Sequence, residues 1–273
     1  MLREELRIAV AREIGIDESI VNVIDVTKNN GVKKVGITIS ESNVSPIFYI
    51  EAILRSIENG WESVSEAAKH IARQYMETTF PSIPAIPDLF KNAVIQIVNA
   101  DANAEMLNDV PNVRFLDLAG VVRVKVNESA NMRVTYGLCN KLGIDADELL
   151  KKAMENTKNA GFQIMGIGAA LGQDDENNAD LFVVTNAENT YGASAILFPE
   201  LLGDYAKRMR GDFFILPSSI HEILLYPVSK ADATALRGMV RSINADANLI
   251  SPDDVLSNNV YLYKADTKEL VVA

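Results

Sequence analysis

The sequence predicts an α+β protein with antiparallel sheets, and three observations support this class. Of the 273 residues, 48% are hydrophobic and 23% are charged, which is typical of a globular chain. Segments rich in β-branched and aromatic residues come in pairs that are separated by turn residues, so they predict β-hairpins. Helical segments follow these pairs. The chain therefore repeats a strand-hairpin-strand-helix unit, which favours antiparallel sheets with helices packed on them, on one face.

The beginning of the chain predicts one helix and one hairpin. Residues 1–15 carry apolar side chains at helical spacing, and Gly15 is expected to end that helix. The β-rich segments 21–26 and 35–39 are separated by Asn-Asn-Gly. Because glycine adopts positive φ without steric cost, we expect Gly31 in that conformation at the turn.

Two further helices and a domain boundary are expected after this hairpin. One helix should begin at Ser45-Pro46 and run to Glu58, and a second should cover about 62–79, with Ser63 or Ser65 as its N-cap. Three prolines then follow within residues 81–87. Proline removes a backbone donor and disfavours helix before it, so this segment is the best candidate for a boundary.

The boundary divides the chain into an N-terminal ββα-type subdomain, residues 1–80, and a main α+β domain, residues 88–273, although one compact unit remains an alternative. In the main domain strands are expected at 121–126, 132–136, 181–185, 192–197, 213–216 and 222–226, with a closing hairpin of 260–263 and 269–272. Helices are expected at about 145–158, 199–209 and 232–245. The segments 213–216 and 223–225 are continuously apolar, which predicts strands in the centre of a sheet, covered on both faces.

The charge balance argues against nucleic acid and membranes as partners. The chain has 26 Lys and Arg against 37 Asp and Glu, for a net charge of -11. Nucleic-acid affinity comes mostly from Lys and Arg on phosphates, and no basic stripe is present. The N-terminus lacks the apolar core of a signal peptide, and no segment has the 18 or so apolar residues that span a bilayer. We therefore expect a cytoplasmic protein.

No cofactor or metal is expected either. The glycine-rich segment 161–172 has Leu171 where a dinucleotide fingerprint needs its third glycine, so a linker or packing turn is the better interpretation. The acidic segment 174–180 lacks the glycine and glutamate of a calcium-binding EF-hand loop. One cysteine, Cys139, and two histidines, His70 and His221, make a transition-metal site improbable.

The strongest candidate site joins two predicted hairpins. The turn at 217–222 combines hydroxyl, imidazole and carboxylate side chains, and histidine titrates near neutrality. Asn189 and Tyr191 from the neighbouring hairpin are expected nearby. In a strand Ser219 and His221 share one face while Glu222 points to the other, so a simple closing turn remains the alternative. The candidate binding residues are Ser218, Ser219, His221, Glu222, Asn189 and Tyr191.

Three segments, in the same order over essentially the whole chain, are distinctive: 27–32, 185–187 followed by 191–197, and 213–223. Through these segments the sequence resembles a family of uncharacterised proteins of about this length from low-GC Gram-positive gut anaerobes and their mobile elements and phages. The closing part is also distantly similar to a second uncharacterised family of the Bacillus type. The resemblance implies a soluble bacterial protein, and it assigns no catalytic residue.

We expect a non-enzymatic binding or regulatory protein whose partner is a small molecule or a protein. No complete phosphate loop, metal cluster or nucleophile elbow is present in the sequence. One alternative is a hydrolase-like or nucleotide-processing enzyme that uses His221 and Glu222. Another is a protein that sequesters a host nucleotide signal or a host protein.

Overall fold

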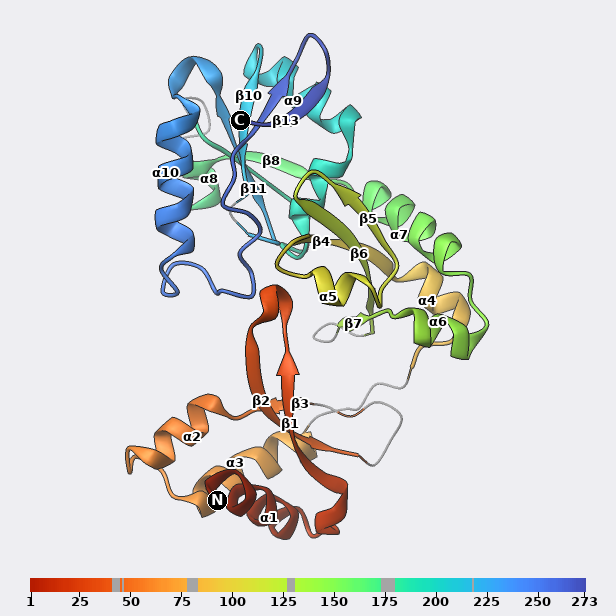
Figure 1. Cartoon of the computed structure of the whole chain (residues 1–273), viewed down its shortest axis with the longest axis vertical. Helices are drawn as coiled ribbons and strands as arrows, with labels where there is room; N and C mark the ends of the chain where they lie inside the picture. Colours follow the sequence, from red (N-terminus) through yellow and green to blue (C-terminus); the bar gives the residue numbers. More distant parts are fainter. Residues whose placement is uncertain (41–44, 46, 78–82, 127–130, 173–179, 218) are drawn as a thin grey trace. The chain divides into compact units, whose positions relative to one another are not determined.

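The computed structural model describes residues 1–40, 45, 47–77, 83–126, 131–172, 180–217 and 219–273 (Figure 1). The chain divides into two compact units, Met1–Ala85 and Ile86–Ala273. Each unit has its own hydrophobic core and antiparallel sheets. The α+β class expected from the sequence is therefore confirmed.

The N-terminal unit packs three helices against a three-stranded sheet of order β1-β2-β3. Its elements are α1 (Leu2–Ile14), β1 (Val21–Thr27), β2 (Lys33–Ile39), β3 (Ile47–Tyr49), α2 (Glu51–Glu58) and α3 (Val64–Glu77). Short 3-10 turns lie at Glu18–Ile20 and Asn29–Gly31.

Local sequence signals predict most of this unit correctly. Helix α1 ends at Gly15, which adopts φ 82°. Strands β1 and β2 form the expected antiparallel hairpin, and Gly31 has φ 70° at its turn. Ser63 and Glu66 form a reciprocal capping box at the start of α3, since each side chain accepts the backbone N–H of the other.

The helix expected from Ser45 is wrong at its beginning, because residues 47–49 form strand β3 and α2 begins at Glu51. Phe48 pairs with Ile37 of β2, and its ring packs edge-on against Tyr75 at 6.5 Å between centroids. Burial of this aromatic side chain in the sheet outweighs the local signal of Ser45-Pro46.

The C-terminal unit contains two antiparallel sheets that share one core. Its first part comprises α4 (Ile86–Lys91), β4 (Ala93–Asn99), α5 (Ala104–Leu107), β5 (Asn112–Phe115), β6 (Leu118–Lys125), β7 (Asn131–Arg133), α6 (Tyr136–Leu142) and α7 (Ala146–Ala160). Its second part comprises β8 (Gln163–Gly166), α8 (Ile167–Ala170), β9 (Phe182–Thr185), a 3-10 segment η3 (Gly192–Leu197), α9 (Pro199–Met209), β10 (Phe213–Leu216), β11 (Ile223–Pro227), a short 3-10 turn (Val228–Lys230), α10 (Ala233–Asn244), β12 (Tyr261–Lys264) and β13 (Glu269–Val272).

In the smaller sheet β6 is central, with β4 on one side and both β5 and β7 on the other. Strand β4 is consequently an edge strand. One face of β4 and β6, including Ile95 and Val122, packs in the main core with Leu149 and Ala153 of α7. The opposite face carries Val98 and Val121 at one end and polar side chains at the other. Asp145 caps α7 as the sequence indicates.

The larger sheet has the order β13-β12-β10-β11-β9-β8, so the expected central position of β10 and β11 is confirmed. Phe213 and Ile215 face the core formed with α9 and η3. Phe214 and Leu216 face Leu236 and its neighbours on α10. Because both faces of β10 are apolar, helices cover both faces, and the expectation of helices on one face alone is wrong for this sheet.

Three other expectations are corrected in this unit. Residues 192–197 form a buried 3-10 segment instead of a strand, because small side chains let the chain turn tightly against β9 and β11. The glycine-rich segment 161–172 contains edge strand β8 and helix α8. The expected strand at 132–136 is shorter, since β7 ends at Arg133.

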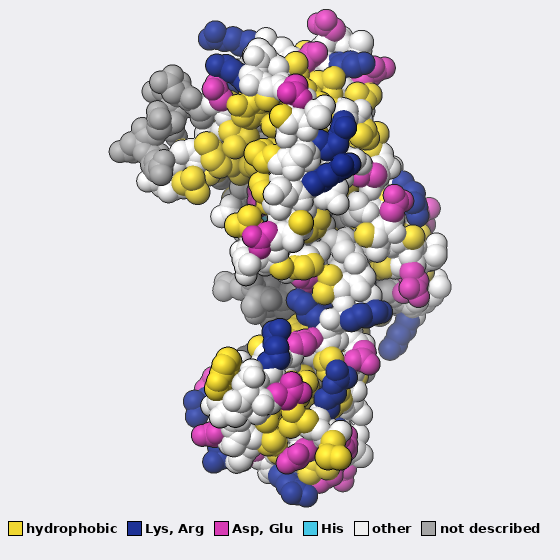
Figure 2. Space-filling view, turned by 60° about the vertical axis from the view of Figure 1, so that its left-hand side comes forward, with side chains coloured by type: hydrophobic (Ala, Val, Ile, Leu, Met, Phe, Trp, Pro, Cys, Tyr) yellow, Lys and Arg dark blue, Asp and Glu magenta, His cyan; other side chains and the backbone are white. Residues whose placement is uncertain are grey.

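The surface carries both signs of charge. On the face shown in Figure 2, Lys and Arg side chains are interspersed with Asp and Glu, without a continuous stripe of either. Among the described residues, no helix is long and apolar enough to cross a membrane.

Candidate functional site

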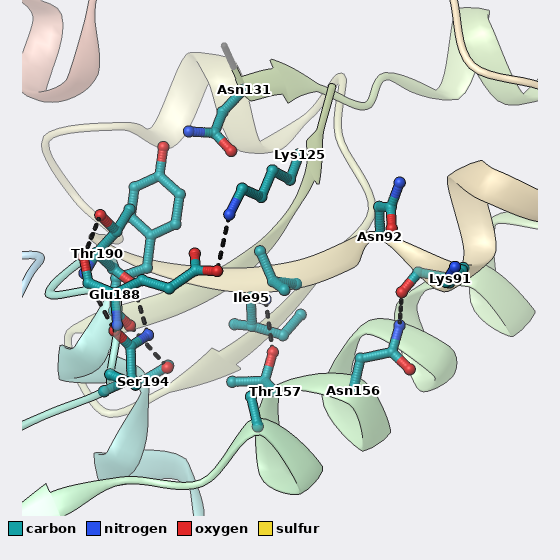
Figure 3. A pocket seen from close by; sticks show the side chains of 15 residues that line it. Lys91, Asn92, Ile95, Lys125, Asn131, Asn156, Thr157, Glu188, Thr190 and Ser194 are labelled. Atoms are coloured by element: carbon teal, nitrogen blue, oxygen red, sulfur yellow. Dashed lines mark hydrogen bonds and ion pairs between the residues drawn. The ribbon is translucent and has the colours of Figure 1, made fainter. Parts of the chain in front are cut away.

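A cavity of about 630 Å³ lies beside the edge strand β4 of the C-terminal unit (Figure 3). Four segments form its walls: the end of α4 with the start of β4, helix α7, the ends of β6 and β7, and the loop that connects β9 to η3. The lining residues are Lys91, Asn92, Val94, Ile95, Lys125, Asn131, Asn156, Thr157, Ala160, Asn186, Ala187, Glu188, Thr190, Tyr191 and Ser194.

Two side chains of helix α7 bond the backbone at the end of α4 and the start of the edge strand β4. The amide of Asn156 donates to the carbonyl oxygens of Phe90, Lys91 and Ala93 at 2.8, 3.1 and 2.9 Å. The Thr157 hydroxyl accepts the N–H of Ile95 at 2.8 Å. These bonds hold β4 against α7 and make this wall of the cavity rigid.

The loop at 186–191 is folded around Asn186. The Oδ1 atom of Asn186 accepts the N–H groups of Glu188 and Thr190, both at 3.1 Å, and its Nδ2 donates to the Thr190 carbonyl at 2.7 Å. Asn189 and Tyr191 adopt positive φ of 50° and 60°. Asparagine side chains stabilise such turns by bonding nearby backbone, so the loop is internally braced.

The charged groups of the lining are two lysines and one carboxylate. Lys125 Nζ lies 2.7 Å from Glu188 Oε1, across the mouth between β6 and the loop. Within the part of the chain that the structure describes, Lys91, Asn92 and Asn131 have no side-chain hydrogen bond or ion pair. The lysine ammonium groups can only donate hydrogen bonds, whereas the amides can both donate and accept them.

Of the residues expected from the sequence, Tyr191 lines the cavity and His221 lies directly behind it. Their rings stack at 5.9 Å between centroids with 10° between planes, and the Tyr191 N–H donates to His221 Nδ1 at 3.4 Å. Asn189 is exposed in the loop and is not part of the lining. The structure therefore brings Tyr191 and His221 together, whereas Asn189 is part of the turn and adopts positive φ there.

The other candidates lie around His221, outside the lining. The Ser219 hydroxyl donates to Glu222 Oε1 at 2.7 Å and accepts the His221 N–H at 3.0 Å. His221 Nε2 lies 3.7 Å from Asp254 Oδ1. Ser218 falls outside the described residues. Ser219 and Glu222 thus bond within their own turn, whereas the imidazole of His221 contacts Tyr191 and Asp254 outside it.

His221 and Asp254 predict a pH-dependent contribution to stability. The carboxylate of Asp254, 3.7 Å from His221 Nε2, raises the pKa of His221 above its ordinary value, against the opposing effect of burial. A raised pKa in the folded state stabilises the fold below the unfolded value of about 6.5, and this stabilisation disappears as pH rises through the folded value.

We therefore expect the wild type to exceed His221→Gln in melting temperature by more at about pH 5.5 than at about pH 8.5. Thermal unfolding at both pH values measures this difference. The Asp254→Asn background should reduce it, since only the smaller effect of Glu222 would remain, and His70→Gln, at an exposed position on α3, is the matched control. An equal difference at both pH values would contradict the assignment.

Sequence reasoning missed most of the lining, including Lys91, Asn156 and Thr157. These side chains follow no motif, and strand β4 itself was not predicted. Lys125 lies near the end of the predicted strand 121–126, and Asn131 directly precedes the predicted strand 132–136, so the position of polar groups at strand ends was the available signal. Among the residues that the structure describes, no cluster of three or more His, Cys, Asp or Glu could hold a metal ion.

The fold and the cavity define an α+β protein with a polar, lysine-containing pocket at a sheet edge. The chain belongs to DUF5688, a family of unknown function whose model matches residues 2–265. This match confirms the resemblance to a family without an assigned activity. Searches of curated proteins and of solved structures found no match.

Proposed function

We propose that this protein binds a small anionic molecule in the cavity beside β4 and that it acts by binding and not by catalysis. The observation that carries the proposal is the composition of the lining: two lysines, several amides and one tyrosine surround a cavity of about 630 Å³. That volume is typical of small-molecule sites, in which a few polar groups orient the ligand.

The polar groups of the lining form two sets, one bonded to the backbone and one available to a ligand, and this arrangement supports a binding site. Asn156, Thr157 and Asn186 are engaged with backbone and hold the walls. Among the described residues, the side chains of Lys91 and Asn131 instead make no hydrogen bond or ion pair, and they remain available to a ligand. A rigid wall with available donors reduces the entropic cost of binding.

The arrangement around His221 supports binding over hydrolysis. Its Nδ1 accepts a backbone N–H and its Nε2 faces Asp254, while the Ser219 hydroxyl donates to Glu222. A serine nucleophile requires a hydrogen bond from its hydroxyl to the imidazole.

We place this binding role, with a regulatory consequence, in the bacterial cytoplasm, as the family resemblance implies.

The test is a thermal-shift screen of the full chain with anionic metabolites and their neutral counterparts. A ligand at a hundredfold excess over its Kd raises stability by about 2.7 kcal/mol. Lys125→Gln should weaken binding of the selected anion at least tenfold, because it removes a cation and leaves Glu188 unpaired. Glu188→Gln should strengthen binding, because it removes the only carboxylate of the described lining.

Lys141→Gln makes the same charge change at an exposed position on α6 and is the matched control. Equal effects of Lys141→Gln and Lys125→Gln, or no stabilisation by any anion, would contradict the proposal. Mass spectrometry of the selected ligand after incubation separates a binder from an enzyme, since turnover would convert it to product.

A further inference from the structure

Arg123 lies in the sheet immediately beside the cavity. It is central in β6, opposite Val94 of β4 and opposite Arg133 of β7. Residues directly opposite in an antiparallel sheet share one face, as do residues two apart on one strand. Arg123 therefore shares its face with Val94 and Lys125, and both of these line the cavity.

The charge of Arg123 is not matched by a carboxylate among the described residues. Its Nε donates to Oε1 of the buried Gln96, which is the only hydrogen bond of the guanidinium in that part of the chain. Burial lowers the pKa of Arg123 to about 10, and the nearby positive charge of Arg133 acts in the same direction, while Tyr191 opposes it. A partly buried cation without an anion is costly to the fold.

We propose that Arg123, which stands beside the lining of the cavity and not in it, anchors a phosphate group of the ligand from the face of β6 that it shares with Lys125. This inference rests on the proposed function and specifies its ligand class, a compound that carries a phosphate monoester. The guanidinium of arginine presents paired N–H donors that match two phosphate oxygens. With Nε occupied by Gln96, the terminal amino groups are the donors for the phosphate.

The charge balance favours a dianion over a carboxylate. Lys91, Lys125 and Arg123 supply three positive charges, and Glu188 is the only carboxylate of the described lining. The excess of two positive charges equals the charge that a phosphate monoester carries near neutral pH. Tyr191 forms the adjacent wall and stands beside the remainder of such a ligand.

The test is calorimetric titration of the full chain with inorganic phosphate, with acetate as the monoanionic comparison. We expect phosphate to bind the wild type more tightly than acetate does. Arg123→Gln should weaken phosphate binding at least tenfold, and Arg123→Lys should weaken it less, because lysine keeps the charge and loses the paired donors. Lys141→Gln is the control and should leave affinity unchanged.

The melting temperature of the ligand-free variants is a second readout. Removal of an unmatched cation should leave the Arg123→Gln variant as stable as the wild type or more stable, although it binds phosphate poorly. If Arg123→Gln does not fold, the phosphate affinity of Arg123→Lys tests the inference. A lower affinity than that of the wild type supports the role of Arg123, and an equal affinity overturns it. Loss of stability in both variants without loss of phosphate binding would overturn the inference and make Arg123 structural.

The remaining outcomes separate this inference from the proposed function. Anion binding that depends on Lys125 but is unchanged in Arg123→Gln would overturn the role of Arg123 and leave the binding function standing. Binding of carboxylates in preference to phosphate would likewise overturn the role of Arg123 and leave the binding function standing. No response to any anion would overturn both.

Discussion

Replacing Gly192 with alanine should lower the free energy of unfolding by about 3 kcal/mol or more, the largest effect expected of a single substitution here. A β-carbon at this position would lie 2.5 Å from the His221 carbonyl oxygen and 2.6 Å from Thr185 Cα. Both neighbours are backbone atoms of central strands or their turns, so the structure cannot relax cheaply around the added methyl group.

The same substitution should weaken ligand binding, because Gly192 follows Tyr191 and sets its position over His221. Denaturant unfolding followed by circular dichroism measures the first effect, and titration of the selected anion measures the second. Gly238→Ala is the matched control, since Gly238 lies within α10 with open space around it. That control should stabilise the protein by up to about 1 kcal/mol. A Gly192→Ala variant as stable as the wild type would refute the packing of η3.

Asp117→Ala should cost about 3 kcal/mol of stability. Asp117, in the turn between β5 and β6, accepts hydrogen bonds from Ser257 Oγ at 2.6 Å, Asn259 Nδ2 at 3.0 Å and Tyr261 Oη at 2.8 Å. Ser257 and Tyr261 are buried, so alanine leaves two hydroxyl groups without this partner. Burial raises the pKa of Tyr261 far above its ordinary value, which keeps the hydroxyl a donor.

Unfolding in urea measures this loss, and Asp117→Asn should lie between the wild type and alanine because its single carbonyl oxygen still accepts. Asp266→Ala removes an exposed carboxylate at the β12–β13 turn and serves as the control. If Asp117→Ala and Asp266→Ala had equal effects, Asp117 would not connect the two sheets of the C-terminal unit.

The parts of the fold that were predicted depend on signals within a few residues. Gly15 ends a helix, Gly31 forms a turn, and Asp145 caps α7, each through a bond or backbone angle in its own segment. The continuous apolar segment 213–216 likewise indicated a central strand before its neighbours were known. The incorrect predictions, at 45–49 and 192–197, are places where distant partners outweighed the local pattern.

Less of the candidate site than of the fold was predicted from the sequence. As expected, residues of the two hairpins lie together, since the ring of Tyr191 stacks on that of His221. The cavity, however, is lined by Tyr191 together with residues of β4 and α7, and the Ser219 turn does not line it. Strand β4 was not predicted, although residues 93–99 are rich in Val and Ile. The role of Asn156 gave no signal in the sequence. An asparagine on a helix acquires a function only when an edge strand lies within reach of its amide.

The sequence by itself determined the α+β class, the hairpins and the helix ends, because turn geometry, capping and alternation are settled between near neighbours. Only the tertiary structure decided which strands pair beyond the hairpins, and with them the cavity. Its walls come from segments around residues 91, 125, 156 and 188, which meet because β4 and β6 pair and α7 covers the edge of β4. Side chains that face a cavity follow no period along the chain, so their meeting is a property of packing.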